Sequence, residues 1–164
     1  MTTSVAIGTA LTLSYQTANA GSATANLPVT AIVQNTCAAS ADPIAFATYI
    51  AGGGPVTGSA NITVKCSSAL AFKVALGPGA TPGGSISQRL LSNGSQSLQY
   101  NLYTASDLRS IWGDGTTGVT LSRTASSDGL ATSLTVFAEV PDSGMNRLAM
   151  PGTYSDLVTV TITY

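Results

Sequence analysis

Residues 152–164 read GTYSDLVTVTITY, and this stretch decides the fold. From Val158 onward, apolar residues alternate with threonines. Successive side chains of a β-strand point to opposite faces, so a period of two predicts a half-buried strand with one apolar face. That face carries Val158, Val160, Ile162 and Tyr164.

The same alternation recurs along the chain and predicts further strands of this kind. Clusters such as Gly77-Pro78-Gly79 and Gly113-Asp114-Gly115 separate these stretches and are typical of turns. No stretch has a convincing helical period. We therefore expect an all-β domain whose antiparallel strands pack as a sandwich. The apolar positions that share a face are Ile62, Val64 and Cys66; Phe72, Val74 and Leu76; Leu98, Tyr100 and Leu102; and Leu134, Val136, Ala138 and Val140.

The composition is apolar and almost uncharged. The 164 residues suit a single domain, and an apolar share of 44% is enough to build a core. Charged residues make up only 8%, and the net charge of −1 with scattered cations gives no basic stripe for a nucleic-acid partner. No uncharged run is both long and apolar enough to predict a transmembrane helix.

The first 20 residues have features of an export signal. Val5 to Leu13 is mildly apolar, and Ala18-Asn19-Ala20 matches a small-residue cleavage site. No Lys or Arg follows Met1, however, and the alternation of apolar residues between Val5 and Tyr15 leaves a structural strand as the alternative. We expect residues 1–20 to be a signal peptide and residues 21–164 to be one mature domain.

Cys37 and Cys66 are the only two cysteines. An even count in an exported chain indicates one disulfide, which would close a loop of about 29 residues and stabilise the fold by about 3–4 kcal/mol. Two buried free thiols are the alternative. Two cysteines without any histidine do not complete a zinc site, so we expect neither a metal nor a cofactor.

The absence of histidine excludes a Ser-His-Asp or Cys-His catalytic arrangement, and we expect no enzymatic activity. Lys65 and Lys73 are interpreted as solvent-facing strand residues rather than catalytic bases. Trp112 with Asp114 has two interpretations: a sugar-binding stack, or a tryptophan packed at a sandwich edge beside an aspartate that caps a turn. We favour the second, and we also consider that Arg89 pairs with Asp156.

Both ends of the sequence bear on assembly. Residues 21–36 form a second strand-like region that Pro28 interrupts, a residue tolerated only at an edge or break. After the strand that ends at Tyr164 we expect no further strand. Tyr154, just before that strand, either borders a groove or anchors a turn.

Several motifs are spread over nearly the whole mature chain, and the most specific of them is the ending. These elements are Cys37; Phe46 and Tyr49; Gly58-x-x-x-Ile62-x-Val64-x-Cys66; Arg89-Leu90-Leu91; Leu98-x-Tyr100-x-Leu102-Tyr103; Trp112-Gly113-Asp114-Gly115; Val136-Phe137; and Gly152-x-Tyr154-x-Asp156-x-Val158-x-Val160-x-Ile162-x-Tyr164. Together they resemble the spore coat protein U domain family, which includes subunits of archaic chaperone–usher pili of the Csu type.

The resemblance implies an incomplete immunoglobulin-like β-sandwich that lacks its final strand and is completed by donor-strand exchange. It implies that a periplasmic chaperone and an outer-membrane usher assist assembly, and that identical or related subunits join head to tail. The family's disulfide corresponds to Cys37 and Cys66. The donor segment is residues 21–29, with Ala23, Ala25, Leu27 and Val29 as its inserted side chains, and the acceptor groove runs beside Val158, Val160, Ile162 and Tyr164.

The function that the resemblance implies is that of a structural subunit of a secreted pilus on the cell surface, supporting surface attachment and biofilm. A spore or cyst coat protein and a carbohydrate-binding surface adhesin are the alternatives.

Overall fold

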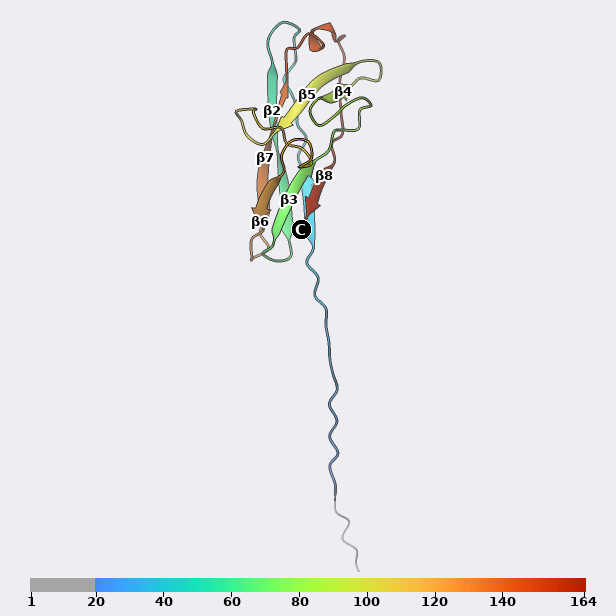
Figure 1. Ribbon diagram of the computed structural model, residues 1–164, viewed down its shortest axis with the longest axis vertical. Coiled ribbons are helices and arrows are strands. Elements are labelled where there is room, and N and C mark those ends of the chain that lie inside the picture. Colours follow the sequence, from blue (N-terminus) through green and yellow to red (C-terminus); the bar gives the residue numbers. More distant parts are fainter. Residues whose placement is uncertain (1–19) are drawn as a thin grey trace, which may run out of the picture. The chain divides into compact units, whose positions relative to one another are not determined.

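The computed structural model describes residues 20–164 (Figure 1). The predicted signal peptide therefore lies outside the described residues, apart from its last position. The chain divides into two units, residues 1–33 and residues 34–164. The described part of the first unit contains no strand, and its large apolar side chains are exposed.

The second unit is all-β, with eight strands and one short 3-10 helix among the described residues (Figure 1). The strands are β1 (Cys37–Ala41), β2 (Val56–Cys66), β3 (Ala71–Leu76), β4 (Arg89–Ser92), β5 (Ser97–Tyr103), β6 (Leu121–Thr124), β7 (Thr132–Val140) and β8 (Val160–Thr163), and the 3-10 helix is η1 (Asn146–Leu148).

These strands form two antiparallel sheets. One sheet has the order β1-β2-β7-β5-β4, and the other has the order β6-β3-β8. The longest ladder joins β2 to β7, from the pair Val56–Val140 to the pair Val64–Thr132. β1 is an edge strand of the first sheet, and β8 is an edge strand of the second.

The core lies between the two sheets and is built from the faces that the period-two pattern predicts. The predicted apolar positions of β2, β3, β5 and β7 are all buried in one cluster. The intervening positions on β2 and β3 are exposed or half-buried, and Lys65 and Lys73 are exposed, as expected for solvent-facing lysines. No helix in the described part is long and apolar enough to cross a membrane.

The structure departs from the predicted strands at both ends of the chain. Residues 20–36 form no strand, although their apolar side chains alternate, because a strand needs a partner for its backbone hydrogen bonds. At the other end β8 covers only Val160–Thr163, so Val158 and Tyr164 lie just outside it. The sequence pattern missed β1, whose small residues CAASA carry no alternation.

Candidate functional site

The two edge strands leave an open apolar groove in the second unit. One wall is residues 41–49, which begin at the last residue of β1, and the other is residues 149–160, which end at the first residue of β8. Each wall packs half-buried side chains against the core. Those of the first wall are Ile44, Phe46 and Tyr49, and those of the second are Tyr154, Val158 and Val160.

Two adjoining cavities open along this groove. The deeper cavity has a volume of about 400 Å³, and its floor consists of core side chains from both sheets: Ile62, Leu76, Leu102 and Val136. The second cavity has a volume of about 740 Å³ and is lined by both walls together with Leu98 and Val140. Because Ile44, Phe46, Leu91 and Asp156 line both cavities, the two are parts of one groove. The groove therefore gives direct access to the core.

Asp156 fixes the second wall to the body. Its carboxylate accepts hydrogen bonds from the Tyr100 hydroxyl at 2.7 Å, and from the backbone N–H of Ala80 and both the N–H and the hydroxyl of Thr81 at 2.9 Å each. Partial burial raises the pKa of Asp156, but the hydrogen bonds from Tyr100 and Thr81 outweigh it and leave that pKa below its ordinary value. Gly79 lies so close to this carboxylate that an added Cβ would collide with it.

Asp142 fixes the first wall. It accepts hydrogen bonds from the Tyr49 hydroxyl at 2.6 Å and from the N–H of Gly52 at 3.1 Å, and it forms an ion pair with Arg147 at 2.8 Å. These hydrogen bonds, led by the one from Arg147, hold the pKa of Asp142 well below its usual range. The groove thus has walls that are tied to the body at several points.

Arg89 is fully buried beneath the turn that Asp156 binds. Its guanidinium donates to the carbonyl oxygens of Gly77, Ile86, Leu76 and Trp112 and to Asn101 Oδ1, and the last of these bonds is 2.7 Å long. Burial lowers the pKa of Arg89. The pairing of Arg89 with Asp156, which the sequence left open, does not occur: neither residue makes an ion pair with the other, because each fills its hydrogen-bonding capacity with backbone and neutral groups.

Trp112 is also fully buried, and its indole N–H donates to the carbonyl of Val74 at 2.9 Å. This overturns the sugar-stacking interpretation, and it places Trp112 in the core rather than at an edge. Asp114 caps a turn, as expected, by accepting from the N–H groups of Thr116 and Thr117.

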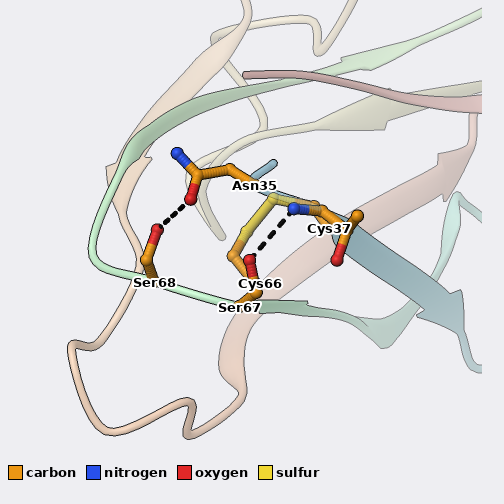
Figure 2. The surroundings of a disulfide bond; sticks show 6 residues. Asn35, Cys37, Cys66, Ser67 and Ser68 are labelled. Carbon is orange, nitrogen blue, oxygen red and sulfur yellow. Dashed lines mark hydrogen bonds between the residues drawn. A yellow bond between two sulfur atoms is a disulfide. The ribbon is translucent and has the colours of Figure 1, made fainter. Parts of the chain in front are cut away.

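The structure joins Cys37 to Cys66 through a disulfide at the first residue pair of the β1–β2 ladder (Figure 2). The disulfide interpretation is thereby confirmed over that of two free thiols. No cluster of three or more potential metal ligands occurs within residues 20–164.

The predicted acceptor residues lie in different surroundings. Val158 and Val160 line the deeper cavity, and Tyr154 lines the wider one. Ile162 pairs with Val74 and packs against the core, whereas Tyr164 is 56% exposed. Residues 41–49 were not predicted to form the opposite wall, although Phe46 and Tyr49 are among the residues that carry the family resemblance.

The predicted donor residues lie in the first unit. Ala23, Ala25, Leu27 and Val29 are all exposed, and the exposed fractions of Leu27 and Val29 are 85% and 84%. Ile32 and Val33, beyond the predicted donor, are exposed as well. The chain therefore carries an apolar leading segment, residues 20–33, and an open apolar groove.

Comparison with known protein families identifies the family of the chain. The sequence profile of the Spore Coat Protein U domain matches residues 23–161. The chain belongs to this family. Members of the Spore Coat Protein U domain family are structural rather than enzymatic proteins, which agrees with the expectation drawn from the missing histidine.

Among solved structures, the chain is similar to a chain in the crystal structure of the CsuC–CsuE chaperone–tip adhesion subunit pre-assembly complex from archaic chaperone–usher Csu pili of Acinetobacter baumannii. The TM-score is 0.56 and the identity is 24%, over 80% of this chain and 40% of that one. This Spore Coat Protein U domain thus spans about two fifths of the chain it resembles, and the likeness concerns the fold. No curated protein matches the chain.

Proposed function

We propose that this chain is a structural subunit of a secreted bacterial pilus. In this proposal its body is an immunoglobulin-like sandwich that lacks the final strand, and residues 21–29 of a neighbouring copy supply that strand. The observation that carries the proposal is the groove, whose floor is made of core side chains from both sheets.

An exposed opening into a core is costly because it leaves apolar surface in water and edge-strand N–H and C=O groups unpaired. The free edges of β1 and β8 border this groove, and an added strand would cover the apolar floor and pair with those groups at the same time. A peptide strand therefore fits this site better than a small polar ligand does.

The leading segment has the chemistry that such insertion requires. Residues 20–36 contain no charged residue, so no charge would have to be buried in the groove. Leu27 and Val29 would each contribute about 1.5–3 kcal/mol on full burial. Each ladder hydrogen bond would add about 0.5–1.5 kcal/mol.

A subunit that offers a donor at one place and a groove at another makes a head-to-tail contact, which does not close and so produces a filament. Before assembly the open groove needs a temporary occupant, and in our proposal a periplasmic chaperone fills it and an outer-membrane usher passes the subunit outward. The similar Csu structure is a complex of a chaperone with a subunit, which supports this assignment. The filament would lie on the cell surface and support attachment and biofilm.

A coat protein of spores or cysts is the second candidate, and the family description favours it. Such a protein would use the same groove and donor within a layer rather than a filament. The third candidate, a carbohydrate-binding adhesin, has lost its main support because Trp112 is buried.

The test is to remove residues 21–33 from the mature chain and to add a peptide that copies them. The deletion should abolish SDS-resistant ladders of the purified protein. Addition of the peptide should strongly raise the thermal and kinetic stability of the deletion variant, because the peptide fills the groove. Ladders that persist in the deletion variant would show that the donor is elsewhere.

Two peptide variants provide matched controls. Leu27→Asp places a charge on the face proposed to enter the groove, whereas Asn26→Asp places the same charge on the opposite face. We expect Leu27→Asp to remove the stabilisation and Asn26→Asp to keep most of it. Equal behaviour of the two peptides would argue against strand insertion.

A further inference from the structure

The leading segment enters the folded body at a point that is fastened to the turn after β2. Ser68 Oγ donates to Asn35 Oδ1 at 2.7 Å, and the backbone N–H of Thr36 donates to Ser67 Oγ at 3.0 Å (Figure 2). The N–H of Ser67 returns a bond to the carbonyl of Thr36 at 2.8 Å. These hydrogen bonds at the start of the body therefore involve residues within two positions of Cys37 or Cys66.

Apart from that disulfide, only weak interactions hold β1 to the body. Its residues after Cys37 are small and exposed, so they bury almost no apolar surface against the body. Ladder hydrogen bonds to β2, and one from the N–H of Asp42 to the carbonyl of Asn61 at 2.9 Å, attach the rest of the strand. Such bonds contribute little individually and can break one after another.

The far end of β1 belongs to the groove. Ala41, Asp42 and Pro43 line the deeper cavity, opposite Val158 and Val160. Peeling β1 from β2 would therefore move one wall of the groove. One short strand thus joins the chain's own leading segment to the wall of the groove.

We infer that the Cys37–Cys66 disulfide is a tension clamp, which passes a pull on the leading segment directly to β2 and so keeps that pull from opening the groove. This inference rests on the proposed function, in which each subunit is pulled through its leading segment. Because Cys37 and Cys66 form the first pair of the ladder, the covalent bond takes the load before any later residue of β1 does.

The strand that receives the load suits the task. β2 is the longest strand and pairs with β7 from Val56 to Val64, and its residues Ile62 and Val64 are buried in the core. A pull on β2 must shear this ladder together with its packed side chains, whereas a pull on β1 alone would separate exposed pairs in sequence. The groove wall at residues 41–43 is then spared until the core itself fails.

A single-molecule pulling experiment tests the clamp. The mature chain is held by its two ends under constant force with saturating peptide 21–33, in oxidised form and after reduction confirmed by mass spectrometry. Reduced molecules should show an added early extension as β1 peels. They should also fail sooner by about tenfold or more, equivalent to about 1.4 kcal/mol of barrier. Without load, the reduced chain should stay folded and keep its peptide.

The variants and the remaining outcomes separate this inference from the proposed function. Ser68→Ala removes the hydrogen bond to Asn35 but keeps the disulfide, and should behave like the oxidised wild type. Cys37→Ser/Cys66→Ser should behave like the reduced chain and ignore the reductant. Equal lifetimes of oxidised and reduced molecules, or spontaneous unfolding of the reduced chain without load, would overturn the clamp. Failure of the peptide to bind either form would instead contradict the proposed function, because peeling of β1 can be observed without the peptide.

Discussion

Arg89 organises the turn behind the groove while it is completely removed from water. One guanidinium satisfies four carbonyl oxygens and one side-chain amide oxygen, so its charge is solvated by the protein instead of by an opposite charge. Nothing in the local sequence predicts this role, because Arg89 looks like any of the scattered surface cations. Its position at the start of β4, within the family motif Arg89-Leu90-Leu91, was the one available signal.

Replacing Arg89 with methionine should therefore destabilise the fold strongly. The variant leaves buried carbonyl oxygens without donors, and we expect the free energy of unfolding to fall by about 3 kcal/mol or more. Urea denaturation measures this change. The matched substitution Arg123→Met on exposed β6 should cost less than about 0.5 kcal/mol. A small loss at Arg89 would show that water replaces its hydrogen bonds.

Asp156 should make stability depend on pH. Its pKa in the folded protein is lowered, so its contribution is present above the ordinary value of about 3.9 and is lost as the pH falls through the folded-state pKa. Asp156→Asn should therefore lower the melting temperature at pH 7 and make it fall less between pH 5 and pH 3 than in the wild type. A parallel fall in both proteins would assign the acid sensitivity to the other carboxyl groups whose pKa values are lowered, those of Asp142, Asp114 and Asp128.

At the scale of elements, the period-two rule located the central strands well. The faces of β2, β3, β5 and β7 are buried as predicted, because half-buried strands impose that pattern on the sequence. β1 and β6 escaped notice, since their exposed edge positions do not require apolar residues. Residues 41–49 also escaped notice, because a groove wall without ladder pairing has no period of its own.

For the leading segment the alternation predicted a strand that the structure does not contain. Residues 21–33 alternate like a strand, yet they form none in this chain, because alternation records which side chains seek burial and not where the partner strand lies. The pattern is the one expected of a strand whose partner lies in another molecule. It is consistent with the donor that the family resemblance implies.

The wall formed by β8 and its lead-in can be tested by moving a charge from one face to the other. Val160→Asp places a carboxylate in the groove, and Thr161→Asp places one on the exposed face. We expect Val160→Asp to weaken binding of peptide 21–33 by at least about tenfold, equivalent to about 1.4 kcal/mol, and Thr161→Asp to change it little. Circular dichroism checks that both variants remain folded. Equal affinities would place the binding surface elsewhere.

At the scale of the whole molecule, the proposed donor and the groove are separate parts of one chain. The walls of the groove are built from residues near both ends of the body, whereas the proposed donor precedes the body in the sequence. Few surface charges are available for association, so contact between copies depends on buried apolar area and strand pairing. Assembly should accordingly depend weakly on salt.

The most direct measurement is amide hydrogen exchange on the mature chain without residues 21–33, before and after addition of the peptide 21–33. We predict fast exchange along residues 43–49 and 157–159, which lie outside the β1–β2 and β3–β8 ladders, in the free protein, and strong protection of both stretches once the peptide binds. Protection that is already present in the free protein, or that appears only elsewhere on addition of the peptide, would contradict a body that is one strand short.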